Sequence, residues 1–320
     1  MTKIRLGIVG TAEIAFRRFL PALIKNDNFE YIGVASRDIE KTKKFTDIYG
    51  GIGYKGYEEI INDNSIDALY IPLPPSLHYE WSYKALNSGK HVLLEKPFTT
   101  NIDDTRNLIE IAKKKNLALH ENYMFEYHSQ LNYAKKIVNE KILGNLRLIR
   151  IIFSFPKRNE DDFRYKKELG GGALLDCGGY TVKLANILLG DSAKLVYSYL
   201  NKVENSDVDI FGNVTIANGE GLNAQLSFGM DNTYRCELEL LGSKGSAIFS
   251  RIFTAPIDFN PSVVINILGK EENIVLDNDD QFYNSIEEFR NCIYDEKRRI
   301  KNYDDIIRQG NMIHEIANRR

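Results

Sequence analysis

Cysteine, tryptophan and long apolar runs are all scarce in this sequence of 320 residues. The three cysteines, Cys177, Cys236 and Cys292, are scattered and odd in number, so they provide neither a disulfide framework nor the spacing of a metal site. No run approaches the ~18 apolar residues of a membrane span. The N-terminal residues lead into a predicted strand without the apolar core of a secretion signal. We therefore expect a cytoplasmic protein without bound metal or membrane association.

Charge of either sign is also not in excess. The net charge is −2 and the pI about 6.3, which argues against a general nucleic-acid surface but leaves local basic pockets open. Hydrophobic residues make up 43% of the chain. That content and this length suit a soluble protein with two cored domains.

Residues 1–121 alternate short apolar runs with amphipathic stretches, which is typical of a doubly wound parallel sheet. We predict a dinucleotide-binding Rossmann domain there. The predicted strands are 4–9, 31–35, 68–72, 91–94 and 117–120. The predicted helices are 13–25, 39–48, 77–87 and 102–115.

Residues 122–320 have a different order of predicted elements, with most of the strands in one run. We predict a second, α+β domain there for substrate binding and oligomerisation. Helices are predicted at 131–141, 173–188, 282–294 and 303–318. Strands are predicted at 146–155, 195–200, 210–216, 222–228, 236–241, 247–249 and 263–268. Turn signals between these runs favour a large, mainly antiparallel open sheet.

The segment after the first strand resembles a degenerate dinucleotide-binding loop. Such loops carry three glycines, for the turn, for approach to the pyrophosphate and for helix packing. Only Gly10 is glycine here, while Ala12 and Ala15 occupy the other two positions. Amides at a helix start still favour an anion. The predicted cofactor contacts in this loop are Gly10, Thr11, Ala12, Glu13 and Ile14.

The second strand ends in Ser36 and Arg37, where an NAD site usually carries an acid for the ribose hydroxyls. A hydroxyl and a guanidinium suit a 2′-phosphate, so NADP is preferred and NAD remains possible. The alternative is that Arg37 is a solvated loop residue and Asp38 supplies the acid.

The loop after the strand 68–72 contains Pro72, Leu73 and His78, which we predict to line the cofactor. Its prolines stiffen an edge on which a planar ring can lie. The same pattern also fits a plain strand-to-helix turn with Ser76 as the helix N-cap.

Two separated segments carry the predicted chemistry. Glu95 and Lys96 follow an apolar strand, and Asp176 and Tyr180 follow the glycines 170–172, one helical turn apart. A phenol is a proton reservoir at neutral pH, and an ammonium beside it stabilises a developing alkoxide. We therefore predict Lys96, Tyr180 and Asp176 to be catalytic in carbonyl reduction, with Glu95 and Lys96 also at the cofactor. Taken singly, a solvated lysine, a packed tyrosine and a capping aspartate explain the same residues.

The sequence resembles the Gfo/Idh/MocA oxidoreductase family, in which these motifs occur in the same order. The resemblance covers nearly the whole chain. The resemblance implies a Rossmann domain, a C-terminal domain with an open sheet, and hydride transfer between NAD(P) and a sugar or polyol. The stretches 11–18, 20–23, 227–230, 242–245 and 253–256, with Tyr234, look like NADP-dependent C-3 ketoreductases of nucleotide-linked deoxysugars.

In those enzymes a lysine matches Lys96, and a tyrosine matching Tyr180 is the proposed acid. Many other relatives have histidine at position 180 and an acid where this chain has Lys183. The resemblance thus implies reduction of a keto-sugar, and association into a homodimer or homotetramer through the C-terminal sheet. The predicted substrate contacts are Tyr123, Arg164, Asp176 and Tyr180, with Arg17 and Arg18 as further phosphate candidates.

Three other functions remain open at this point. One is oxidation of a free sugar or cyclic polyol, because residues do not show reaction direction. Another is a non-catalytic regulator that senses a dinucleotide, although such a sensor has no need of both Lys96 and Tyr180. The last is a glycosidase that retains its cofactor.

Overall fold

The computed structural model describes residues 2–204 and 206–319, which form two compact units. The first unit holds the residues up to Asn122 together with Phe282–Gly310, and the second holds Tyr123–Gln281 and the residues from Asn311. The sequence pattern predicts a single domain over 122–320, so the return of Phe282–Gly310 to the first unit is a difference. Its physical cause is burial, described below.

The first unit is built on a sheet of six strands, all paired in parallel, in the order β3-β2-β1-β4-β5-β6. Four-residue β4 is buried throughout, as expected of a parallel strand covered on both faces. The strands are β1 (Ile4–Val9), β2 (Phe29–Ser36), β3 (Ile52–Lys55), β4 (Ala68–Ile71), β5 (His91–Leu94) and β6 (Leu119–Glu121).

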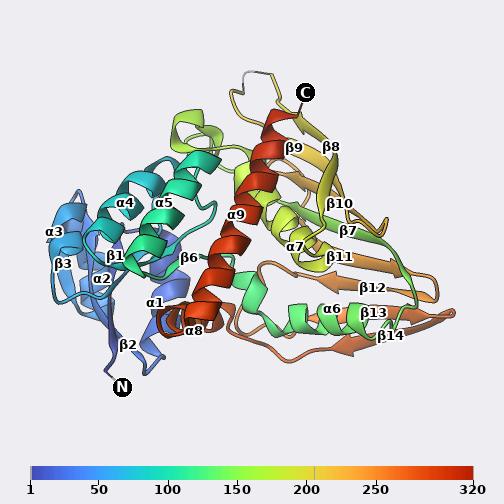
Figure 1. The fold of residues 1–320 in the computed structure, drawn as a ribbon, viewed down its shortest axis with the longest axis horizontal. Coiled ribbons are helices and arrows are strands. Elements are labelled where there is room, and N and C mark those ends of the chain that lie inside the picture. The colour runs from blue at the N-terminus through green and yellow to red at the C-terminus, as the bar shows by residue number, and fades with distance from the viewer. Residues whose placement is uncertain (1, 205, 320) are drawn as a thin grey trace. The chain divides into compact units, whose positions relative to one another are not determined.

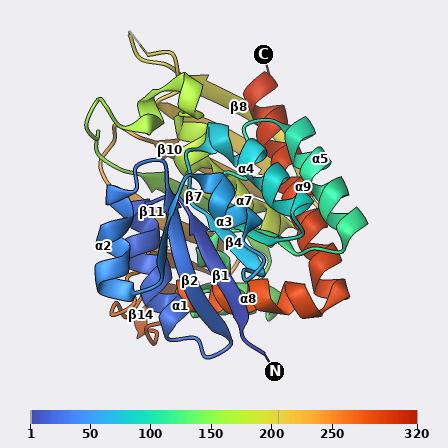
Figure 2. The ribbon, with the colours of Figure 1, turned by 90° about the vertical axis from the view of Figure 1, so that its left-hand side faces the viewer.

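Helices cover both faces of this sheet (Figures 1 and 2). They are α1 (Leu20–Ile24), α2 (Glu40–Tyr49), α3 (Tyr57–Asn62), α4 (His78–Asn87), α5 (Ile102–Lys115), α8 (Gln281–Tyr294) and α9 (Glu296–Asn318). Apolar residues of α3, α4, α5 and α9 share one core with β4 and β5. Phe289 of α8 is fully buried, and the Tyr303 hydroxyl of α9 donates to the Leu117 carbonyl. These contacts hold the C-terminal helices in the first unit.

The strand order reverses between β1 and β4, which start the two halves of the sheet. In open parallel sheets, ligands bind beyond the carboxyl ends of the strands at this point. Gly10 follows β1, Pro72 follows β4 and Lys96 follows β5. The fold therefore brings three predicted site segments to one edge of the sheet.

The second unit contains an eight-stranded sheet in the order β14-β13-β12-β11-β7-β10-β9-β8. Within this second sheet, the described residues form one parallel pairing, between β7 and β10, and the other pairings are antiparallel. The prediction of a mainly antiparallel sheet is confirmed. The strands are β7 (Leu146–Ser154), β8 (Lys194–Asn201), β9 (Phe211–Ala217), β10 (Asn223–Gly229), β11 (Arg235–Gly242), β12 (Gly245–Ser250), β13 (Ser262–Ile267) and β14 (Lys270–Val275).

Two helices, α6 (Ser129–Asn139) and α7 (Gly179–Leu189), pack on one face of this sheet (Figure 1). Tyr133 of α6 contacts Phe249 of β12, and α7 packs on β7 and β10. Alternate residues of the strands are buried beneath them, such as Ile149, Ile151 and Phe153 of β7. Within the described residues, no helix combines the length and the apolar character of a membrane span.

Two predicted helices contain π-helical turns that their sequences did not reveal. Ala15–Phe19 precedes α1, and Leu174–Gly178 precedes α7. Pro21 in α1 has no N–H for the carbonyl four residues earlier, which is compatible with a widened turn. Missed elements are β3 with α3, which are short, and β14, whose exposed sequence KEENIV has no apolar alternation.

Candidate active site

Gly10 forms the tight turn after β1. Its φ of 111° lies in a region that favours glycine. A Cβ there would stand 2.7 Å from Cδ2 of Leu73. The Gly10 N–H donates to the Ala35 carbonyl at 3.0 Å. The structure therefore brings together the predicted cofactor residues Gly10 and Leu73 from two neighbouring strand ends.

The rest of this loop leads into the first helix. The Ala12 carbonyl accepts from the Phe16 N–H at 3.2 Å, so helical bonding begins at Ala12, after Thr11. Ile14 immediately precedes the π-helical turn. The Glu13 carboxylate is exposed and ion-paired with both Arg17 and Lys44, of which Lys44 contributes most to lowering its pKa. Glu13 thus holds two cations beside the loop.

The structure at the end of β2 shows which of the two residues Arg37 and Asp38 is engaged by the protein itself. Ser36 is buried, and its Oγ accepts from the Asp38 N–H at 3.3 Å. Asp38 Oδ1 accepts from the Glu40 N–H at 3.2 Å, so this carboxylate caps the start of α2. Arg37 is exposed and forms no ion pair among the described residues. Its guanidinium is available to an anionic ligand.

His78 is fully buried at the start of α4. Its Nδ1 lies 2.8 Å from the Pro97 carbonyl oxygen and its Nε2 lies 2.7 Å from that of Leu73. Burial lowers its pKa, although both carbonyls oppose this. The ring thereby ties the loop of Pro72 and Leu73 to the turn after β5. This is a positioning role, which the sequence pattern did not distinguish from direct contact with a cofactor.

Glu95 at the end of β5 belongs to a hydrogen-bond network that the sequence pattern does not reveal. Its Oε1 accepts from the Tyr70 hydroxyl and from Nδ2 of Asn122, both at 2.6 Å. The Ser285 hydroxyl of α8 donates to Oδ1 of Asn122 at 2.7 Å. Burial raises the pKa of Glu95, and the two donors partly offset that shift. The network fixes the residue directly before Lys96.

The turn that carries Lys96 is held on its other side as well. The peptide bond between Lys96 and Pro97 is cis. The Phe98 N–H donates to Glu121 Oε1 at 2.9 Å, and His78 contacts the Pro97 carbonyl as described above. Bonds from β4, from β6 and the residue after it, and from α4 therefore converge on this short turn, and α8 holds Asn122 in place. They fix the backbone from which the ammonium projects.

In the second unit, Tyr180 of α7 lies in an aromatic pocket and is 6% exposed. The neighbouring ring centroids are 5.1 to 5.7 Å away and belong to Tyr123, Phe125, Phe153 and Phe253. Its hydroxyl is 3.7 Å from Sδ of Met124. The pocket orients the phenol. It also places the predicted substrate residues Tyr123 and Tyr180 side by side.

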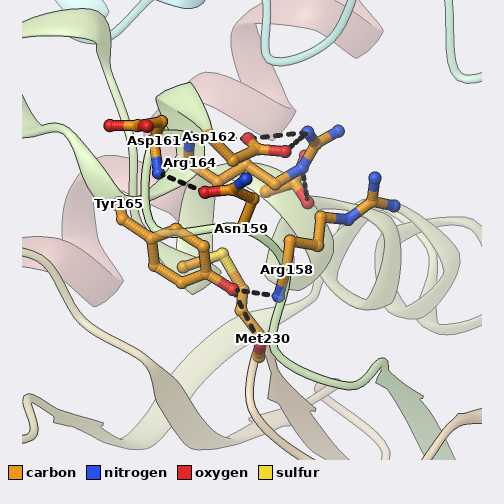
Figure 3. A network of polar contacts seen from close by, with 8 residues as sticks. Arg158, Asn159, Asp161, Asp162, Arg164, Tyr165 and Met230 are labelled. Carbon is orange, nitrogen blue, oxygen red and sulfur yellow. Dashed lines mark hydrogen bonds and ion pairs between the residues drawn. The ribbon is translucent and has the colours of Figure 1, made fainter.

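Asp176 lies in the π-helical turn before α7 and pairs with Arg164, whose Nε donates to Oδ2 at 2.8 Å. Arg164 also binds Asp162 at 3.0 Å, within the polar loop that Figure 3 shows. Burial acts against the charge of Arg164, yet the two carboxylates raise its pKa. Two more predicted substrate residues thus form one ion pair.

The glycines before this turn lie where other parts of the protein pack closely against the backbone. A Cβ at Gly171 would stand 2.4 Å from the Arg164 carbonyl oxygen, and one at Gly172 would stand 2.5 Å from Oδ1 of Asp209. Asp209 also accepts from the Leu174 N–H at 2.7 Å. These glycines therefore allow the backbone before the π-helical turn to pack closely against the loop of Arg164 and against Asp209.

Lys183 lies about one helical turn after Tyr180, and its positive charge is paired with a carboxylate of the same unit. Its Nζ is 3.2 Å from Oε2 of Glu126 and 5.9 Å from the centre of the Tyr123 ring. The lysine side chain is 8% exposed. A buried cation needs such a partner.

No group of three or more histidine, cysteine or acidic side chains is placed to hold a metal among the described residues.

Comparison with known proteins decides the family. Residues 4–123 match the family model described as an oxidoreductase family with an NAD-binding Rossmann fold, and residues 131–248 match the GFO/IDH/MocA C-terminal domain. The chain belongs to the Gfo/Idh/MocA oxidoreductase family. The predicted Rossmann domain and fold class are confirmed.

Members of the family with named activities are similar over nearly the full length. The chain is 36% identical to dTDP-3,4-didehydro-2,6-dideoxy-alpha-D-glucose 3-reductase of Actinomadura kijaniata, over 97% of this chain and 93% of that protein. It also superposes, with a TM-score of 0.95, on a 3-ketoreductase from the same organism in complex with NADP and TDP-benzene. That match has 36% identity and covers 99% of this chain and 97% of the other.

We predict that Tyr70→Phe destabilises the protein by about 1–3 kcal/mol, because it removes a donor from a buried carboxyl. The phenyl ring keeps its stacking on Phe19, so the loss reports the hydroxyl alone. Chemical denaturation measures the difference. Tyr83→Phe, at a tyrosine that is 43% exposed, is the control and is expected to change stability by less than about 0.5 kcal/mol. Equal effects of the two variants contradict the network.

Proposed function

We propose that the protein is an NADPH-dependent reductase of a ketone on a nucleotide-linked deoxysugar, of the C-3 ketoreductase type. The observation that carries the proposal is the enclosed phenol of Tyr180, in a chain that matches such reductases from end to end. The family supplies the redox class. Tyr180 supplies the proton donor that reduction of a carbonyl requires.

The residues around the β1 turn fit a dinucleotide. Gly10 keeps the turn free of a Cβ, and helix amides follow directly, which is the arrangement that binds a pyrophosphate. Arg37 supports NADP over NAD, because its guanidinium is unpaired among the described residues while Asp38 is engaged in capping α2. Ser36, Pro72, Leu73 and Glu95 are the other proposed members of this site, with His78 positioning the loop.

In the proposed mechanism, NADPH would supply the hydride for the carbonyl carbon when it is bound at the residues named above. Tyr180 donates its phenolic proton to the carbonyl oxygen as the C–O π bond breaks, so the ketone becomes an alcohol. The tyrosinate regains a proton from water. Lys96 provides a positive charge that stabilises the developing oxyanion. Asp176, held by Arg164, and Tyr123 orient the sugar.

We expect Tyr180→Phe to lower turnover by ~10²–10⁴-fold, as for loss of a general acid. The phenyl ring preserves the aromatic packing, so NADPH affinity and thermal stability stay near wild type. Steady-state kinetics with a dTDP-linked keto-sugar and NADPH titration measure both quantities. Turnover at the wild-type rate would show that another group donates the proton.

For Arg37→Ala we expect NADPH binding to weaken by about 10–100-fold, the cost of losing one or two charge-assisted hydrogen bonds to a phosphate. NADH has no 2′-phosphate and serves as the internal control. Its dissociation constant is therefore expected to stay within about twofold of wild type. Fluorescence titration of both cofactors gives the ratio, and equal losses remove Arg37 from the specificity argument.

We also propose that the protein is a homodimer or homotetramer that associates through the uncovered face of the eight-stranded sheet. By register, this face carries Leu241, Ile248 and Tyr199 beside the pair of Arg150 and Glu239. Leu241 and Ile248 are each 41% exposed and Tyr199 is 58% exposed. Exposed apolar groups flanked by charges are typical of interfaces.

The net charge of −2 and three free, buried cysteines support small-molecule partners and a cytoplasmic location, without nucleic acid or membrane.

The double variant Leu241→Asp with Ile248→Asp is expected to be monomeric, because it buries two unpaired charges in the interface. Light scattering coupled to size exclusion measures the mass. The control is Leu268→Asp, in the turn between β13 and β14, where the leucine is 79% exposed. A double variant with wild-type mass argues against this face.

A further inference from the structure

Several basic side chains at one end of the eight-stranded sheet are paired with carboxylates, whereas two arginines there are not. This end contains the last residues of β7, β10 and β12 and the first residues of β11. Among the described residues, Arg158 and Arg251 form no ion pair, and each guanidinium lies over an aromatic ring. The paired ones are Lys157 with Glu160, Arg164 with Asp162 and Asp176, Lys166 with Asp161, and Arg235 with Glu237.

Arg251 directly follows β12, and two rings support it. Its Cζ is 5.4 Å from the centre of the Tyr234 ring and 5.6 Å from that of Phe259. Its φ of 52° is uncommon for a residue with a side chain. A side-chain amide holds this backbone, since Nε2 of Gln130 donates to the Arg251 carbonyl at 3.2 Å. The guanidinium is thus held in a defined place with its donors unmatched by any acid among the described residues.

Arg158 is held in a comparable way. Its Cζ is 5.0 Å from the centre of the Phe155 ring, and its backbone N–H donates to the Tyr165 hydroxyl at 2.9 Å. Figure 3 shows the side chain extended, with the hydrogen bond at its backbone nitrogen. Aromatic faces attract a guanidinium without using its N–H donors. Those donors therefore stay available to an anion.

Both guanidinium groups belong to the end of the sheet where Tyr180 packs. Ser154 pairs with Arg235, so Phe155 and Tyr234 are the next residues outward on the two strands. They continue the alternation of Phe153 and Cys236, which are buried on the face that carries α7. The Phe153 ring lies 5.2 Å from that of Tyr180 and 6.4 Å from that of Phe155. A chain of contacts therefore links Arg158 to the proposed proton donor: Arg158 lies over Phe155, and the Phe153 ring lies between Phe155 and Tyr180.

We propose that Arg251 and Arg158 bind the diphosphate of the nucleotide-linked substrate, and so place its sugar against Tyr180. This inference rests on the proposed function. A diphosphate offers oxygens that a guanidinium binds through two parallel N–H donors. Two preorganised guanidinium groups without carboxylate partners among the described residues match two phosphate groups in charge. A hexose then spans the interval from its phosphate-bearing carbon to its carbonyl at Tyr180.

Titration of the intact protein with thymidine, dTMP and dTDP tests the proposal, because these ligands differ only in phosphate number. The variants are Arg251→Gln, Arg158→Gln and the double replacement, each checked for a wild-type melting temperature. Arg147→Gln is the matched control: Arg147 is also exposed and without an ion pair among the described residues, but lies at the opposite end of β7. NADPH is titrated in parallel to separate the diphosphate of the cofactor from that of the substrate.

We expect Arg251→Gln to weaken dTDP by about 10–100-fold, the value of one or two charge-assisted hydrogen bonds. Arg158→Gln should have a smaller effect because Arg158 is exposed, and the double variant the largest. Thymidine and NADPH affinities and the Arg147→Gln control stay within about twofold of wild type, since none of them involves the proposed contacts. Losses that are equal for thymidine and dTDP, or larger for NADPH than for dTDP, overturn the proposal. A wild-type protein that binds NADPH but not dTDP overturns the proposed substrate class itself, which distinguishes the two failures.

Discussion

The aromatic enclosure of Tyr180 is the constraint on which the second unit depends. Rings from β7, from the segment after β12 and from the chain just before α6 surround one phenol. Their packing determines where α7 meets the sheet, and hence where Asp176 and Lys183 stand. A proton donor is effective only when it is held in place, and here apolar burial does the holding. Polar contacts lie at the rim.

The first unit uses the opposite strategy, because its site lies at the ends of buried parallel strands. Polar groups at these strand ends are buried away from water, so they need hydrogen-bond partners within the protein. Glu95 is satisfied by Tyr70 and Asn122, and His78 by two backbone carbonyls. Each of these contacts links adjacent strand ends. The turn that presents Lys96 is therefore held through the residues on either side of it.

The sequence was sufficient for the elements with clear apolar periodicity and for the residues at strand ends. It identified β1, β5 and α5 to the residue, and it placed Gly10 and Lys96 at the edge where the strand order reverses. It did not predict contacts between distant residues, such as Ser285 with Asn122, because nothing local marks them. The same holds for the return of α8 to the first unit. The π-helical turns escaped because their apolar spacing differs little from that of an α-helix.

Charge pairing separates residues that support the fold from residues left for ligands. Arg17 is a phosphate candidate by sequence, but it is engaged by Glu13, and Arg164 is engaged by two aspartates. Arg37, Arg158 and Arg251 are the guanidinium groups that the proposals use, and none has an acidic partner among the described residues. The net charge of −2 then poses no obstacle to binding two polyanions. Attraction at close range depends on unpaired local charge rather than on the total, since salt screens exposed charges beyond about 8–10 Å.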